Sequence, residues 1–322
     1  MRSESERYAR RMISVFGADD VRRAVSPREA YDAVREAFVS HARGEWTKPP
    51  KVYVANFPAG DFRAMPALGG GHALLKWVTS FPGNPARGLP TVTGLVLLSD
   101  AGDGRALAVL DAASVTALRT AAAGVLAAET LRRDDATTWA VVGCGPNGSE
   151  TVRLLTALGL VPVVWDVDEA RRAAVAREHG ARAAESAEEA LASDVVVTVT
   201  PGHVPVLQAG SLRAGQHVSL MGADGPGKAE VAMEELRRAR LFCDDWEQAS
   251  HGGELAGAVS KGLVSREDVT DLGAVLTGAA VGRRSSEEIT LFDSTGLAIQ
   301  DLAIARLAFT KCGQLDLRTI DL

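Results

Sequence analysis

The second half of the chain alternates short apolar runs with helical stretches, and this alternation limits the possible folds more than any other feature. Helical patterns such as residues 149–158 and 168–179 lie between the apolar runs. The runs suited to buried strands are residues 139–142, 161–165, 194–200 and 217–221. Strands that alternate with helices form a parallel sheet with right-handed crossovers. The sequence therefore predicts an α/β fold with a doubly wound parallel sheet.

The segment after the first of these strands has the pattern G-x-G-x-x-G. Gly143, Gly145 and Gly148 fill the glycine positions, with Pro146 and Asn147 between the last two. Between a strand and a helix, the first glycine permits a tight turn and the second lets the backbone approach a pyrophosphate. The third packs the helix close to the strand, and the helix N-terminus attracts phosphates. These five residues are predicted to bind a dinucleotide, and an ordinary tight turn is the alternative.

The second strand is followed by Asp166, whose position suits a hydrogen bond to the adenosine ribose. A carboxylate there favours NAD, because the 2′-phosphate of NADP would meet a like charge. Arg171 and Arg172 lie nearby and could serve a phosphate, so NADP stays open. The alternative is that Asp166 or Asp168 only caps the next helix.

The first 130 or so residues show no such regular alternation, and a chain of 322 residues is expected to form two domains. Residues 26–38 predict a helix, and a second helix is expected over residues 112–131. The charged segment 132–135 then gives a plausible domain boundary. Three shorter runs suit strands: residues 52–54, 73–75 and 91–98.

Composition excludes several classes of protein. The net charge of −6 and the pI near 5.6 argue against nucleic acid as the main partner. No apolar run has the length of a membrane span, and the charged N-terminus does not resemble a signal peptide. Cys144, Cys243 and Cys312 are far apart and predict reduced thiols in a cytoplasmic protein. The histidines show no metal-ligand spacing, so no metal is expected.

Motifs along almost the whole chain resemble the ornithine cyclodeaminase/mu-crystallin family, and most of all its archaeal-type alanine dehydrogenases. They are PPKVYV (49–54), DFRAMPA (61–67), LKWVTSFPGNP (75–85), GLPTV (88–92), ALRTAAA (117–123), GADGPGKAE (222–230), DDWEQASHGGE (244–254) and EEITLFDSTGLAIQD (287–301). The resemblance implies a Rossmann domain over residues 133–299. It also implies a discontinuous α+β domain, residues 1–132 and 300–322, for substrate binding and homodimer formation.

The resemblance implies NAD-dependent oxidative deamination of a small L-amino acid, alanine to pyruvate and ammonia, run reversibly. Such chemistry needs a cation for the carboxylate, a Cα hydrogen aimed at the nicotinamide and a group that transfers protons. Three alternatives remain: an ornithine cyclodeaminase, an imine or ketimine reductase that uses NAD(P)H, and a ligand-binding protein without activity.

Lys76, inside an apolar run, is the conspicuous cation of the first domain. By resemblance Lys76 serves catalysis, Arg63 or Lys51 holds the substrate carboxylate, and Met65 and Arg119 line the substrate site. The alternatives are a solvated edge-strand position for Lys76 and salt bridges for Arg63 and Arg119.

Asp224 is the predicted acid or base, because it follows the strand 217–221 at the edge of the sheet where open α/β folds bind ligands. Helix capping is its alternative role. Thr200, Ser294 and Thr295 follow apolar runs and by resemblance contact the cofactor. Cys144 is expected to fill space without acting as a nucleophile.

Two positions depart from the alanine dehydrogenases, which carry Asn and His where this chain has Thr79 and Phe81. At the position of Arg63, ornithine cyclodeaminases carry a glutamate. A second cation in the pocket disfavours a substrate with a distal ammonium group. A small, neutral amino acid is therefore expected.

Overall fold

A computed structural model gives the fold and describes residues 12–202, 204–223, 225 and 227–321. The chain divides into two compact units, residues 1–119 with 297–322 and residues 120–296. The division falls inside helix α4 (Ala112–Leu131), whereas the charged segment 132–135 lies just after the end of this helix. No helix of the described part is both long and apolar enough to cross a membrane.

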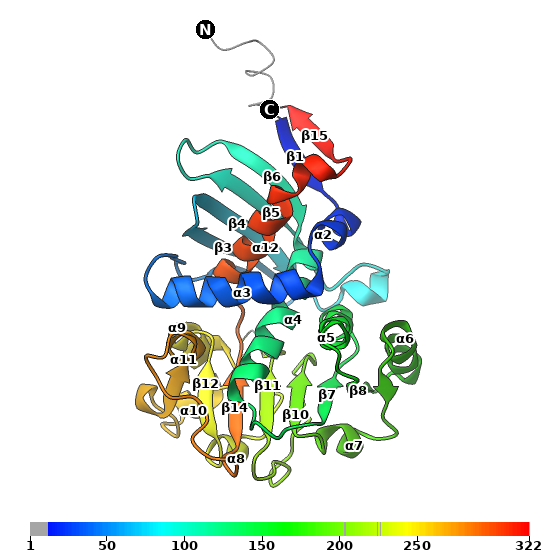
Figure 1. Cartoon of the computed structure of the whole chain (residues 1–322), viewed down its shortest axis with the longest axis vertical. Coiled ribbons are helices and arrows are strands. Elements are labelled where there is room, and N and C mark those ends of the chain that lie inside the picture. Colours follow the sequence, from blue (N-terminus) through cyan, green and yellow to red (C-terminus); the bar gives the residue numbers. More distant parts are fainter. Residues whose placement is uncertain (1–11, 203, 224, 226, 322) are drawn as a thin grey trace. The chain divides into compact units, whose positions relative to one another are not determined.

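The second unit holds an eight-stranded sheet in which every pair is parallel, in the order β13-β12-β14-β11-β10-β7-β8-β9 (Figure 1). The strands are β7 (Trp139–Val142), β8 (Val163–Trp165), β9 (Arg182–Ala183), β10 (Val195–Thr198), β11 (His217–Leu220), β12 (Arg240–Cys243), β13 (Val269–Asp271) and β14 (Thr290–Asp293). The helices are α5 (Pro146–Ala157), α6 (Glu169–His179), α7 (Ala187–Leu191), α8 (Met233–Leu236), α9 (Trp246–Gly252), α10 (Ala256–Ser260) and α11 (Leu272–Leu276). This arrangement confirms the predicted doubly wound α/β fold.

The central strands of this sheet are buried on both faces, as parallel sheets require. Every residue of β7, β10, β11 and β14 is buried. The expected strand over residues 161–165 is shortened to β8, because Val161 is exposed and Pro162 has no N–H for the ladder.

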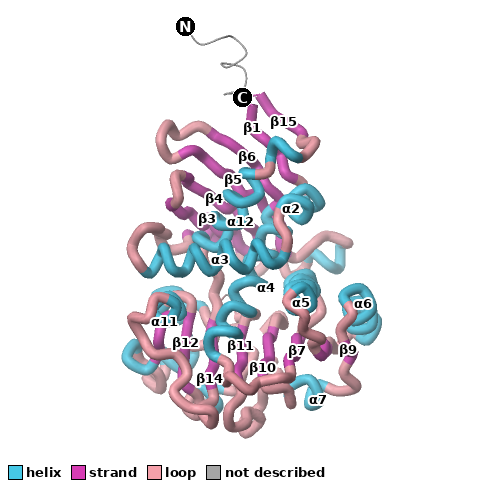
Figure 2. Tube along the Cα trace, viewed as in Figure 1, coloured by secondary structure: helices cyan, strands magenta, loops and turns pink. Residues whose placement is uncertain are grey.

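The first unit holds a seven-stranded mixed sheet in the order β15-β1-β6-β5-β4-β3-β2. Only β1 and β6 pair in parallel within it. Its strands are β1 (Met12–Phe16), β2 (Val52–Asn56), β3 (Gly60–Gly69), β4 (His72–Ser80), β5 (Val92–Asp100), β6 (Ala106–Asp111) and β15 (Arg318–Asp321), and its helices are α2 (Ala18–Ala24), α3 (Pro27–Ala42) and α12 (Ala298–Thr310). Helix α12 packs on β3, β4 and β5 and against α3, and Figure 2 shows both helices on one side of the sheet.

Alternation along β3, β4 and β5 gives the sheet of the first unit two different faces. Met65, Lys76 and Val96 pair across the three strands and are all buried on the face that α12 covers. Their neighbours in sequence point to the opposite face, where Trp77 is 42% and Leu95 is 58% exposed. The period of two along β4 therefore places Lys76 in the interior rather than in solvent.

Candidate functional site

The glycine loop has the backbone geometry that a pyrophosphate site requires. Gly143 has φ +101, and a Cβ there would lie 2.7 Å from the carbonyl oxygen of Val199. A Cβ on Gly148 would lie 1.8 Å from the carbonyl oxygen of Gly143, so only glycine lets α5 approach β7 this closely. A Cβ on Gly145 would meet nothing within 4 Å. The space beside Gly145 is therefore open, as the close approach of a pyrophosphate to the backbone requires.

Helix α5 starts directly from this loop. Gly145 is its N-cap and offers no side-chain cap, and Pro146 and Asn147 are its first two residues. The first N–H groups of a helix have no partner inside the helix, and they carry the positive end of its dipole. The loop and the start of α5 together fit the phosphates of a dinucleotide.

Asp166 lies just after β8, and its side chain forms a hydrogen bond with the backbone of the glycine loop. Its Oδ2 accepts the N–H of Cys144 at 2.7 Å, and its Oδ1 accepts the N–H of Asp168 at 2.9 Å. Asp168 in turn caps α6 by accepting the N–H of Arg171 at 3.0 Å. Each carboxylate oxygen of Asp166 keeps a second lone pair with which it could accept a ribose hydroxyl. Asp166 thus supports the loop, and the capping role that sequence left open for either aspartate belongs to Asp168.

The thiol of Cys144 inside the loop is buried and protonated. Burial and the carboxylate of Asp166 raise the pKa of Cys144 to about 12, which keeps the sulfur protonated at neutral pH. All three cysteines of the chain are free.

The remaining residues predicted to contact the cofactor follow β10 and β14, whose carboxyl ends lie at one edge of the parallel sheet. The hydroxyl of Thr200 donates to Glu230 at 2.7 Å. Those of Ser294 and Thr295 donate to the two oxygens of Asp244, at 3.1 and 3.0 Å. These three hydroxyls therefore each have a protein acceptor, and their predicted contact with a cofactor stays a prediction.

A set of buried acids at the same edge was not anticipated from the sequence. Glu230 accepts hydrogen bonds from Thr198, Thr200 and Gly222, so it ties the end of β10 to the end of β11. The carboxylate of Glu254 accepts the N–H of Glu230, and burial raises the pKa of Glu254 to about 7. In the sequence, the only signal for these acids was their position after a buried strand or after a pair of glycines. Within the described ranges, no cluster of His, Cys, Asp or Glu could hold a metal ion.

The predicted acid Asp224 lies outside the described residues. Its neighbours Gly222 and Ala223 follow β11 after Met221, and Ala223 is buried. The role assigned to Asp224 therefore rests on sequence alone.

The first unit brings Lys76 together with residues far away in the chain. The Nζ of Lys76 donates to Thr116 Oγ1 at 2.6 Å and to Asp301 Oδ1 at 2.9 Å. The Nε of Arg119 lies 3.6 Å from the same Asp301 oxygen. The side chains of Lys76 and Asp301 are 2% and 0% exposed, which rules out the solvated position considered for Lys76. We call Lys76, Thr116, Arg119 and Asp301 the lysine cluster.

The lysine cluster combines a lowered lysine pKa with buried polar atoms that lack hydrogen bonds from described residues. Burial, together with Arg119 and Arg63, lowers the pKa of Lys76 to about 8, although Asp301 acts in the opposite direction. No described residue forms a hydrogen bond with Arg119 Nε or with Asp301 Oδ2, and both atoms are buried. Two cations thus share one carboxylate, and an anionic ligand would complete the cluster.

Arg63 and Met65 share the Lys76 face of the sheet. Met65 pairs directly with Lys76 across β3 and β4. The guanidinium of Arg63 donates to both oxygens of Asp61, at 2.6 and 3.2 Å, and both side chains are largely buried. The salt bridge considered for Arg63 therefore exists, but it lies inside the unit. Lys51 precedes β2 and is partly exposed.

The two positions that depart from the alanine dehydrogenases lie away from Lys76. Thr79 is an odd number of residues from Lys76 on β4 and so points to the opposite face. The ring of Phe81 packs edge-on against Phe62 at 5.4 Å, and Phe62 also stacks on Trp77 of that opposite face. These departures do not change the face that carries Lys76.

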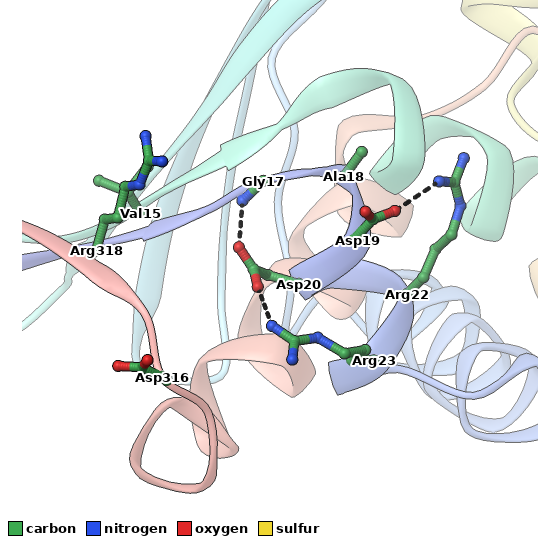
Figure 3. Close-up of a pocket in the computed structure, with 9 residues that line it drawn as sticks. All are labelled: Val15, Gly17, Ala18, Asp19, Asp20, Arg22, Arg23, Asp316 and Arg318. Carbon is green, nitrogen blue, oxygen red and sulfur yellow. Dashed lines mark hydrogen bonds and ion pairs between the residues drawn. The ribbon is translucent and has the colours of Figure 1, made fainter.

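A cavity of about 880 Å³ lies elsewhere in the first unit, beside β1, α2 and β15 (Figure 3). Two of the acids that line it pair with arginines of the same lining, Asp20 with Arg23 at 2.5 Å and Asp19 with Arg22 at 3.5 Å. Its lining contains none of the residues predicted from the sequence. This cavity is therefore not the candidate site.

Comparison with known proteins agrees with the resemblance seen in the motifs. The model of the ornithine cyclodeaminase/mu-crystallin family matches residues 13–314. An alanine dehydrogenase of Archaeoglobus fulgidus is 46% identical over 303 residues, which cover 92% of this chain and 94% of that protein. A solved archaeal alanine dehydrogenase dimer with bound NAD has a TM-score of 0.91 and 42% identity, covering 96% of this chain and 99% of the other. A Δ1-pyrroline-2-carboxylate reductase of Thermococcus litoralis, solved with NADH and L-proline, has a TM-score of 0.89 and 25% identity, covering 96% and 100%.

Proposed function

The chain belongs to the ornithine cyclodeaminase/mu-crystallin family, and on this premise we propose that it is an NAD-dependent dehydrogenase of a small L-amino acid. Alanine is the proposed substrate, and the products are pyruvate, ammonium and reduced cofactor, with water consumed and one proton released. The observation that carries this proposal is the lysine cluster, where two buried cations share a single carboxylate. NAD, when bound, supplies the acceptor for the hydride that leaves Cα.

The α-carboxylate of the substrate is the anion that the lysine cluster would take. Lys76 uses two of its three N–H groups on Thr116 and Asp301, and the third remains for a ligand. Arg119 contributes a buried Nε without a hydrogen-bond partner among the described residues. A buried positive charge without its own counter-ion costs free energy of desolvation, and a bound carboxylate would offset that cost.

Proton transfer is assigned to Lys76 together with Asp224. A pKa of about 8 lets Lys76 hold a proton at neutral pH and release it slightly above, which suits a group that alternates between acid and base. Asp224 enters from its sequence position after β11. Its proposed task is to take the proton from the water that attacks the imine.

Substrate size follows from the acids around Lys76. Of the carboxylates described there, Asp301 pairs with Lys76 and Asp61 pairs with Arg63. Among the described residues around Lys76, a distal ammonium, as in ornithine, would find no acid without a basic partner and would face cations. Repulsion and lost solvation are expected to favour alanine by about a hundredfold.

A competition assay tests this proposal. Alanine and ornithine at equal concentration are incubated with NAD⁺, and reduced cofactor, pyruvate and proline are measured. Net cofactor reduction with pyruvate as the main product supports the proposal. Proline formed without net reduction identifies a cyclodeaminase instead. Faster reduction of a cyclic imine than of pyruvate with ammonia identifies an imine reductase. Asp224→Asn is the matched variant, and it should retain NAD binding while losing turnover by about 10²–10⁴.

The proposed enzyme acts as a homodimer joined through the face of the first unit's sheet opposite Lys76. One row across that face carries Val52, Trp77 and Leu95, which are 57%, 42% and 58% exposed. Large apolar side chains in such a row indicate a surface that a partner covers.

Sedimentation velocity measures the oligomeric state directly. The unaltered chain should sediment as a dimer, and Leu95→Arg should yield monomers. Val161→Arg, at an exposed position of the other unit, serves as the control and should leave the dimer intact. A monomeric unaltered chain would contradict the proposal.

A further inference from the structure

The carboxylate of Asp301 lies between the two cations of the lysine cluster. It comes from α12, 225 residues after Lys76, and its side chain is fully buried. One oxygen, Oδ1, contacts both Lys76 and Arg119, at 2.9 and 3.6 Å. The other oxygen, Oδ2, is buried and has no hydrogen-bond partner among the described residues.

Asp301 and Thr116 together fix the direction of the Lys76 ammonium. The hydroxyl of Thr116 donates to the carbonyl of Ala112 at 2.5 Å, so its oxygen is left to accept from Lys76. With two N–H groups directed at Thr116 and Asp301, tetrahedral geometry determines the direction of the third. A flexible lysine stem is thereby held in one orientation.

Asp301 also opposes the other influences on Lys76. Four influences set the pKa of Lys76: its burial, and the charges of Arg119 from α4, Arg63 from β3 and Asp301 from α12. Burial and the two arginines disfavour the ammonium form, whereas the ion pair with Asp301 favours it. Loss of this carboxylate would remove the group that favours the ammonium form of Lys76 and leave burial and the two arginines to act against it.

We propose that Asp301 is a positioning residue that orients the Lys76 ammonium and keeps it protonated by ion pairing, a role that rests on the proposed use of Lys76 in amino-acid oxidation. Asp301 does not itself act on the substrate in this proposal. It acts through Lys76, whose third N–H meets the substrate.

The first measurement needs no substrate. The chain has six lysines, so NMR of the complete protein labelled with ¹³C and ¹⁵N at lysine gives few side-chain signals, and loss of a signal in Lys76→Met assigns Lys76. Its titration should have an inflection near pH 8 in the unaltered protein. In Asp301→Asn the inflection should fall by about one unit or more. In Asp301→Glu, which keeps the charge, it should stay within about half a unit of the unaltered value.

The second measurement is the pH profile of kcat/KM for alanine. The limb assigned to Lys76 should move to lower pH in Asp301→Asn by the same amount as the NMR inflection. In Asp301→Glu, this limb of the pH profile should lie at the same pH as in the unaltered protein. Because the longer side chain displaces the Lys76 ammonium, kcat/KM should fall by about tenfold or more. Asp19→Asn removes a carboxylate that is 93% exposed in the same unit, and it should change neither measurement.

The two measurements separate the two proposals. The role of Asp301 is overturned if the NMR inflection of Lys76 stays at the same pH in Asp301→Asn. It is also overturned if that inflection moves and the pH profile of kcat/KM does not. Turnover absent in the unaltered protein overturns the proposed function, whereas the NMR titration still decides whether Asp301 holds Lys76 protonated. If Asp301→Asn fails to fold, unchanged kcat/KM in Asp301→Glu overturns the positioning role.

Discussion

The glycine loop of the second unit and the lysine cluster of the first satisfy their polar groups in opposite ways. The loop is held through its backbone, since the N–H of Cys144 donates to the carboxylate of Asp166, which also accepts the N–H of Asp168. The lysine cluster is held by side chains from β4, α4 and α12, and it leaves Arg119 Nε and Asp301 Oδ2 without hydrogen bonds from described residues.

This difference indicates two kinds of preparation for a ligand. A backbone loop has its shape before any ligand arrives, and changes to it act through sterics. A cluster with an excess buried cation favours a ligand of negative charge. Changes to such a cluster therefore act through electrostatics and proton affinity. Substitutions in one region should therefore leave the function of the other nearly intact.

The largest expected effect comes from Lys76→Met, which keeps the length of the side chain and removes its charge. Alanine oxidation should fall by about 10²–10⁴ because a proton-transfer group and a carboxylate ligand are both lost. NAD affinity, measured by calorimetry, should stay the same. Lys261→Met, at an exposed position, is the control. A comparable loss of NAD affinity in Lys76→Met would break the separation between the two regions.

A smaller effect is expected from alanine substitutions in the glycine loop. Gly148→Ala places a Cβ against the carbonyl oxygen of Gly143, so it should weaken NAD binding by roughly 10- to 100-fold and lower the melting temperature. Gly145→Ala meets no protein atom within 4 Å and should weaken NAD binding without a change in melting temperature. Calorimetry and thermal unfolding check both variants. Unchanged NAD binding in Gly145→Ala would show that the pyrophosphate lies elsewhere.

The smallest effect is expected from Asp166→Ser, which removes an acceptor of the loop and of the proposed ribose contact. NAD affinity should fall by about tenfold. NADP affinity should fall less, because the charge that repels a 2′-phosphate is gone. Titration with each cofactor measures the ratio. Equal losses for both would assign Asp166 to supporting Cys144 alone.

Much of the second unit was predictable because its signals are local. The glycine pattern, the strand before it and the aspartate after β8 all lie within residues 139–166, so one short stretch of sequence contains the loop and the aspartate that supports it. Strand ends were less predictable, as the exposed Val161 and the shortened β8 show. In the first unit, β3 was missed because its Gly60 and Pro66 weaken a strand pattern.

By itself the sequence determined the doubly wound parallel sheet, the position of the glycine loop between a strand and a helix, and the unusual position of Lys76 within an apolar run. Only the tertiary structure decided which partners Lys76 has, because Thr116 and Asp301 are 40 and 225 residues away and carry no motif that links them to it. It also decided the hydroxyl partners of Thr200, Ser294 and Thr295. The physical reason is range: strand period and glycine geometry depend on neighbouring residues, whereas burial and ion pairing depend on which distant segments pack together.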